Sequence, residues 1–107
     1  MGLLIAIARK VQLNSQRFMY EAKLTQISSA MSDLSAKIAD YDMLQNDFEP
    51  NSAEAKAFQE KIKRLNQVNQ RLEQQMQKIQ TQLKIIEAEY QTYDQMIQSN
   101  LQRMYAG

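Results

Sequence analysis

The chain has 107 residues, of which 44% are hydrophobic and 23% are charged, and its formal net charge at pH 7 is +1. This length has room for one domain, and a near-neutral charge lacks the basic surface that nucleic-acid binding needs. Cysteine and histidine are absent, and no Gly-rich phosphate loop or carboxylate cluster at ligand spacing is found, so we expect no enzyme activity, no metal site and no cofactor.

Breakers of regular structure are almost missing from the sequence. The only glycines are Gly2 and Gly107, and the only proline is Pro50. Nearly every residue between the ends can therefore be helical. The sequence predicts an all-α protein, a long antiparallel helical hairpin of the coiled-coil type that forms a single domain over 1–107.

An apolar run opens the chain at residues 2–8 and is followed by Arg9 and Lys10. A secretory signal carries its positive charges before a longer apolar run, and a membrane span needs ~20 residues. We therefore interpret the run as part of the mature protein, with contact to a membrane as a less favoured alternative.

The first predicted helix covers about residues 3–47. From Tyr20 onward, apolar residues recur at alternating spacings of four and three, which is typical of a coiled-coil seam; they include Leu24, Ile27, Met31, Leu34, Ile38 and Tyr41. Upstream the stripe changes phase, because Lys10 and Arg17 fall on it. We expect the N-terminal turns to face something else.

A turn is predicted at about residues 48–52, around Pro50, Asn51 and Ser52. The residue before a proline is disfavoured in the α region. Asn51 followed by Glu54 has the spacing of a capping box, which marks the start of a second helix.

The second predicted helix covers about residues 53–104, and its heptad spacing continues along the whole helix. One core position of this repeat is polar, Asn69. A core asparagine can fix the register of a helix pair; a hydrated gap is the alternative. The core residues of this seam are Phe58, Ile62, Leu65, Leu72, Met76, Ile79, Leu83 and Ile86.

The two stripes match when the chain folds back between Asn51 and Ser52. This register pairs Tyr41 with Ile62, Ile38 with Leu65, Met31 with Leu72 and Leu24 with Ile79. It also places the acids of residues 33–54 beside the bases of residues 56–64. Exposed pairs of this kind select a register more than they stabilise it.

Both chain ends carry more apolar residues than one seam can use. Such a surplus usually marks an interaction site, and frayed ends are the alternative. The predicted assembly interface consists of Leu3, Leu4, Ile5, Ile7, Leu101, Met104 and Tyr105.

The Pro50–Asn51–Ser52 turn, the following segment 58–61 and the second helix to about Asn100 resemble the needle subunits of type III secretion systems. The chain departs from that family at Ala53, where needle subunits usually carry a second proline, and at its C-terminal residues. The resemblance implies a helical polymer subunit.

The first hypothesis for function is a structural subunit that assembles with copies of itself into a helical filament, tube or secretion-apparatus polymer, exported without a cleavable signal to the cell surface or beyond. The second is a cytoplasmic coiled-coil chaperone or adaptor of a secretion or motility system. A third is a peripheral membrane protein that inserts residues 3–7. The expected partners are other copies of the chain and other coiled-coil or secretion proteins, with no nucleic acid.

Overall fold

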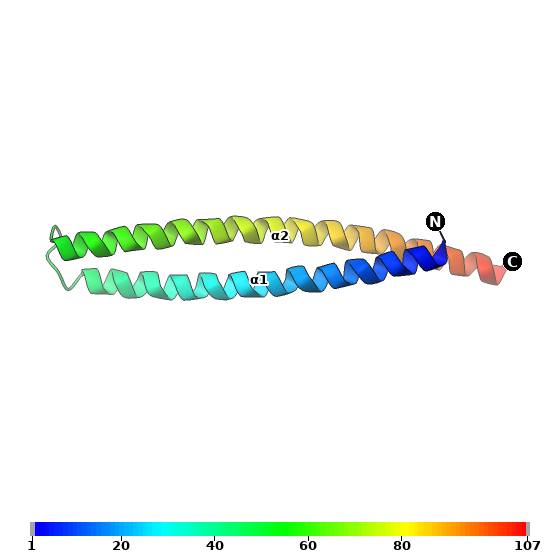
Figure 1. Cartoon of the computed structure of the whole chain (residues 1–107), viewed down its shortest axis with the longest axis horizontal. Coiled ribbons are helices and arrows are strands. Elements are labelled where there is room, and N and C mark those ends of the chain that lie inside the picture. Colours follow the sequence, from blue (N-terminus) through cyan, green and yellow to red (C-terminus); the bar gives the residue numbers. More distant parts are fainter. Residues whose placement is uncertain (1, 107) are drawn as a thin grey trace. The chain divides into compact units, whose positions relative to one another are not determined.

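The computed structural model describes residues 2–106 and confirms the all-α class and the helical hairpin (Figure 1). Helix α1 runs Leu3–Gln45 and helix α2 runs Ala53–Ala106, with no strand among the described residues. Helix α1 therefore ends slightly before the predicted residue 47, and α2 continues slightly past the predicted residue 104. The predicted domain also includes Met1 and Gly107, which lie outside the described residues.

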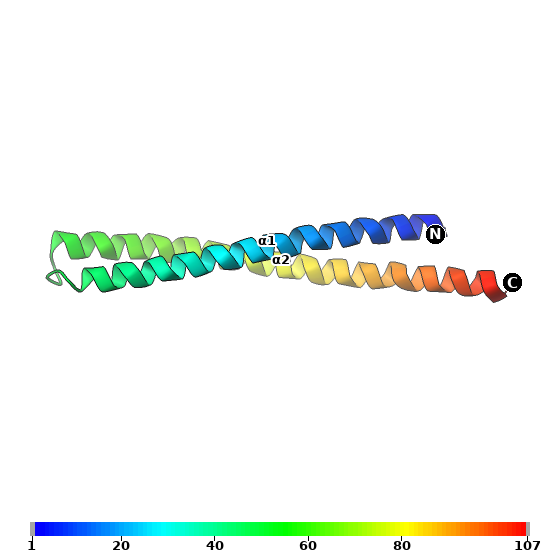
Figure 2. The same ribbon diagram turned by 90° about the horizontal axis from the view of Figure 1, so that it is seen from below.

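The chain divides into two compact units, and each contains part of both helices. We call residues 25–77 the turn unit and residues 2–24 with 78–106 the terminal unit. Within each unit, the segment of α1 runs antiparallel to the segment of α2 (Figures 1 and 2).

In the turn unit, α1 ends in a tight turn and α2 begins at a side-chain cap. The Phe48 amide donates to the Gln45 carbonyl at 3.2 Å, and the Ser52 amide donates to the Glu49 carbonyl at 3.0 Å. Ser52 Oγ then accepts a hydrogen bond from the Ala55 amide at 3.2 Å. Ser52 is therefore the N-cap of α2, so the capping box expected from Asn51 and Glu54 is wrong by one residue.

An aromatic cluster closes the seam beside the turn. The ring of Phe58 lies 5.8 Å from that of Tyr41 and 5.9 Å from that of Phe48. Lys61 Nζ lies 5.5 Å from the Tyr41 ring centroid. The expected ion pairs between residues 33–54 and 56–64 do not form among the described residues, where Arg64 instead pairs with Glu60 of its own helix at 3.7 Å.

In the terminal unit, the seam continues to the first turn of α1. Ala6 is fully buried, and Leu13 is 1% exposed. Counting back from Tyr20 at spacings of three and four reaches Arg17, Leu13, Lys10, Ala6 and Leu3, all buried or half-buried. The expected change of phase is therefore wrong, because this stretch keeps the register with two cations on the seam.

Few side chains of this hairpin are fully covered. The buried hydrophobic residues are Ala6, Leu13, Ala55 and Ile86, while most other seam residues are half-buried. A helix that packs against one partner covers only one side of each seam residue, so a helix pair leaves much apolar surface exposed. None of the described helices contains a segment apolar and long enough to cross a membrane.

Candidate interaction surface in the terminal unit

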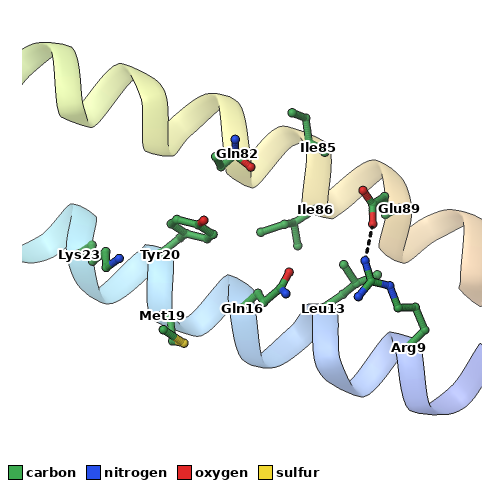
Figure 3. Close-up of a pocket in the computed structure, with 10 residues that line it drawn as sticks. All are labelled: Arg9, Leu13, Gln16, Met19, Tyr20, Lys23, Gln82, Ile85, Ile86 and Glu89. Carbon is green, nitrogen blue, oxygen red and sulfur yellow. Dashed lines mark hydrogen bonds and ion pairs between the residues drawn. The ribbon is translucent and has the colours of Figure 1, made fainter.

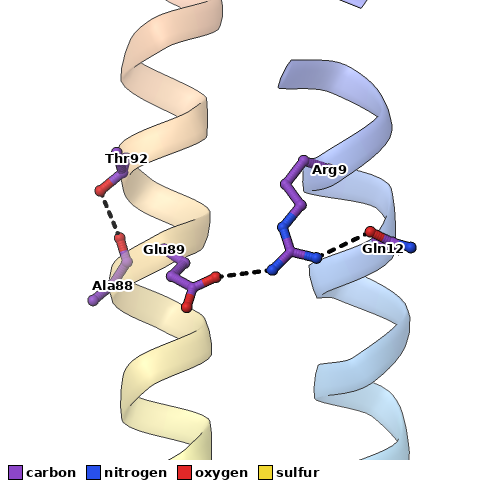
Figure 4. Close-up of polar contacts among 5 residues, drawn as sticks. All are labelled: Arg9, Gln12, Ala88, Glu89 and Thr92. Atoms are coloured by element: carbon purple, nitrogen blue, oxygen red, sulfur yellow. Dashed lines mark hydrogen bonds and ion pairs between the residues drawn. The ribbon is translucent and has the colours of Figure 1, made fainter. Parts of the chain in front are cut away.

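Three ion pairs join α1 to α2 in the terminal unit. Lys10 Nζ donates to Asp94 Oδ1 at 2.6 Å. Arg17 Nη1 lies 3.5 Å from Glu87 Oε2. The third pair is Arg9 Nη2 with Glu89 Oε2 at 3.3 Å, and the Arg9 guanidinium also donates to Gln12 (Figure 4). These pairs neutralise the three cations nearest the N-terminus.

Tyr90 explains how two cations fit on an apolar seam. Lys10 Nζ lies 5.0 Å from the centroid of the Tyr90 ring, and the Arg17 guanidinium carbon lies 5.4 Å from it. Cations are attracted to the face of an aromatic ring, and long basic side chains can cover apolar surface with their stems while the charged end stays wet. Lys10 and Arg17 therefore keep their seam positions.

The hydrogen bond to Asp94 raises the pKa of Lys10 above its ordinary value, and the charge of Asp94 acts in the same direction. Partial desolvation opposes this shift. The ammonium of Lys10 is therefore held in its charged form by α2.

One side of the helix pair carries a polar groove of about 400 Å³ (Figure 3). Leu13, Tyr20 and Ile86 form its floor, and the Arg9–Glu89 pair crosses it. The side chains around this floor are mostly polar or charged: Arg9, Gln16, Lys23, Gln82 and Glu89, with Met19 and Ile85 at the edge.

A second groove of about 350 Å³ is bordered by apolar residues of α1. Ile7 and Val11 line it together with Lys10 and Asn14, and Tyr90 and Ile97 line it from α2. Asn14 accepts a hydrogen bond from Arg17. The groove therefore offers apolar walls, with the Lys10 ammonium and the Asn14 side-chain oxygen each hydrogen-bonded to a neighbouring side chain.

A row of exposed apolar side chains runs along α1 beside this groove. We call it the second stripe, because each member directly follows a seam residue: Leu4, Ile7, Val11 and Phe18. Leu4 is 80% exposed, Val11 66% and Phe18 60%. Asn14 holds the remaining position of this row, which is therefore apolar at four of its five positions. An exposed apolar row of this kind marks a candidate interaction surface.

The predicted assembly residues are placed in the terminal unit and most of them are exposed. Ile5 and Ile7 are exposed with Leu4, as are Leu101, Met104 and Tyr105 of α2, whereas Leu3 is half-buried on the seam. Figures 1 and 2 show that the end of α2 continues beyond the first turn of α1, so the last turn of α2 lacks a helix beside it.

The predicted core residues lie along the facing sides of the two helices. Ile86 is buried, and the other thirteen are half-buried: Leu24, Ile27, Met31, Leu34, Ile38, Tyr41, Phe58, Ile62, Leu65, Leu72, Met76, Ile79 and Leu83. Of the predicted turn residues, Pro50 and Asn51 are exposed and Ser52 is half-buried.

Asn69 lies on the seam of the turn unit with a buried side-chain oxygen. Its Oδ1 accepts no hydrogen bond from any described residue. An unpaired buried acceptor costs about 1–3 kcal/mol. Asn69 therefore has the property expected of a residue that selects the register of a helix pair, because it lowers stability in the correct register.

Val11, Phe18 and the ion-pair residues of the terminal unit were not among the predicted site residues. Their signal is present in the sequence, since Lys10 and Arg17 are one heptad apart and so are Glu87 and Asp94. In an antiparallel register, Lys10 meets Asp94 and Arg17 meets Glu87. The two cations that seem to break the apolar seam therefore stabilise the pairing of the helices.

The described residues contain no group of three or more acidic side chains that could hold a metal ion. Comparisons of the chain with protein-family models, with curated proteins and with solved structures find no match. The resemblance to needle subunits therefore stays a prediction.

Proposed function

We propose that this protein is a structural subunit that assembles with copies of itself into a helical filament, tube or ring. The observation that carries the proposal is the exposed apolar surface of the terminal unit. Ile5 is 62% exposed, Met104 67% and Tyr105 89%. Burying a large apolar side chain gains about 1.5–3 kcal/mol before entropy is subtracted, so several such residues can drive association.

The closing of the seam within one chain also supports this function. The three inter-helix ion pairs and the buried Leu13 and Ile86 give each copy its own core. Each hairpin pairs the two sides of its own seam, whose residues stay mostly half-buried, and its outer apolar residues remain available for contacts between copies.

The proposal is tested by removing exposed apolar side chains without disturbing the core. Deletion of residues 2–8 would also remove Ala6, which is fully buried. A sharper variant carries Leu4→Ser, Ile5→Ser, Met104→Ser and Tyr105→Ser. We expect this variant to stay helical by circular dichroism and to lose assembly in sedimentation and negative-stain microscopy.

Met43→Ser is the matched control, because Met43 is 70% exposed and belongs to the turn unit. We expect it to assemble as the unchanged protein does. Equal assembly of the fourfold serine variant and the unchanged protein would contradict the proposal.

A coiled-coil chaperone or adaptor is the second candidate. It is favoured by the 350 Å³ apolar groove, which is open on a helix pair that already closes its own seam. A client helix lying in such a groove is a common mode of recognition. Purified protein that remains a discrete monomer or dimer at high concentration would favour this function over a polymer.

A further inference from the structure

We propose that the second stripe of α1 binds the second stripe of another copy, so that two hairpins pair through their α1 helices. This inference deepens the proposed self-assembly and rests on it, since the occupant of the groove is another copy of the chain. It adds two details to that proposal. The interface consists of Leu4, Ile7, Val11 and Phe18, and the helix that lies against it is α1 of the other copy.

The stripe has the period of a helix-packing seam. Each member follows a seam residue directly, so the row keeps the period of the seam beside it, with the polar Asn14 at the position between Val11 and Phe18. Apolar residues on two adjacent seams of one helix are what a bundle of more than two helices requires. The second stripe is therefore continuous with the established interface between α1 and α2.

Charge excludes a membrane as the preferred occupant. A helix that binds anionic lipid presents free lysine and arginine beside its apolar face. Here Arg9, Lys10 and Arg17 are each paired with a carboxylate of α2.

The same charges favour a second α1 helix. The Lys10–Asp94 and Arg17–Glu87 pairs satisfy the charges near the groove, so its occupant should be apolar and uncharged. The second stripe has this chemistry, because Leu4, Ile7, Val11 and Phe18 carry no charge. One surface thus supplies both the groove and a matching occupant.

The shape of the surface fits pairing about a two-fold axis. Isologous pairing sets the same patch of two copies face to face, and Val11 is the midpoint between Leu4 and Phe18. In an antiparallel pair centred near Val11, Phe18 of each copy reaches the end of the stripe that contains Ile7 of the other. Phe18 projects as a ring that is 60% exposed, and Ile7 and Val11 line the groove that would receive it.

The pairing is expected to be weak by itself. The stripe extends for about 21 Å along the helix, and stable interfaces contain about 20–30 residues on each side. Four apolar residues on each copy fall short of that size. Contacts by the chain ends would supplement the pairing in a larger assembly.

Single-cysteine variants test the pairing, because the natural chain has no cysteine. Val11→Cys places a thiol at the centre of the stripe, and Ser15→Cys places one at an exposed α1 position outside both stripes. A disulfide requires Cα atoms within about 7 Å. We expect Val11→Cys to form dimers under mild oxidation at least about tenfold faster than Ser15→Cys, and addition of Phe18→Ser to remove this advantage.

Equal rates for the two cysteine variants would overturn the pairing, even if microscopy shows polymers of the unchanged protein. Fast Val11→Cys crosslinking with no polymer at any concentration would keep the pairing and contradict the proposed polymer. Flotation of the unchanged protein with phosphatidylglycerol vesicles, abolished by Phe18→Ser, would identify a lipid surface as the occupant and also overturn the pairing.

Discussion

Lys10 and Arg17 show how a charged residue can occupy a coiled-coil seam. Each lies over the ring of Tyr90 and is paired with a carboxylate one helix away. The ion pairs are partly exposed, and such pairs contribute about 0–1 kcal/mol. Their main effect is on register: the observed register pairs both cations with carboxylates, and neighbouring registers would leave the cations without them.

The ammonium of Lys10 has a raised pKa in the folded protein because it donates to Asp94. A folded pKa above the unfolded value means that the folded state binds this proton more tightly. The resulting stability is fully present below about pH 10.5, the ordinary lysine value, and is lost as the pH rises through the raised pKa. An NMR titration of the Lys10 side chain should give a pKa above 10.5, and Asp94→Asn should lower it.

A titration in which Asp94→Asn leaves the pKa of Lys10 unchanged would contradict this cause.

Asn69 is expected to reduce stability while it selects the register. Asn69→Leu removes an unpaired buried oxygen and adds apolar surface to the seam. We expect the free energy of unfolding to rise by about 1–2 kcal/mol, measured by urea denaturation, and the range of oligomers to broaden.

The matched control for this change is Asn66→Leu, since Asn66 is exposed on the same helix. It should alter the free energy of unfolding by less than about 0.5 kcal/mol. A loss of stability in Asn69→Leu would show that the amide makes a favourable interaction and would reject its role as a costly register residue.

At the scale of the helices, most of the architecture could be predicted from the sequence. The unbroken heptad from Phe58 to Ile97 and the lone Pro50 indicate two helices and one turn, because helix pairing depends on side-chain period and on few breakers. Details of the turn were less accessible. Ser52 and Asn51 are both good caps, and only the backbone path shows that Ser52 receives the Ala55 amide.

The N-terminal part of α1 could not be read from hydrophobicity alone. Lys10 and Arg17 fall on the seam, while Val11 and Phe18 fall beside it, so an apolar-pattern reading assigns the wrong face. The seam at Ala6 and Leu13 depends on long-range partners in α2. Such partners become visible only when both helices are placed in register.

The N-cap of α2 is expected to contribute to the stability of the hairpin. Ser52→Ala removes the acceptor of the Ala55 amide, and loss of an N-cap costs about 1 kcal/mol. We expect the urea midpoint to fall accordingly, with little change in oligomeric state. Ser29→Ala, at an exposed position within α1, should leave stability unchanged or slightly raised, and equal effects of the two substitutions would reject the cap.

For the whole molecule, the two units carry different surfaces. The turn unit holds the aromatic cluster and the cap, while the terminal unit holds the inter-helix ion pairs, the apolar groove and the second stripe. Formal charge differs too: the turn unit holds six basic and eight acidic residues, a net charge of −2, whereas the terminal unit holds seven basic and four acidic residues, a net charge of +3. The exposed apolar residues of the terminal unit, and not its charge, favour assembly through that unit.

Sedimentation velocity of the unchanged protein over a wide concentration range tests the central claim most directly. A subunit that assembles through exposed apolar residues should sediment faster as concentration rises, reach species larger than a dimer, and show the shift abolished in the Leu4, Ile5, Met104 and Tyr105 serine variant. A sedimentation coefficient that stays at the value of a monomer or a dimer at every concentration would contradict the account.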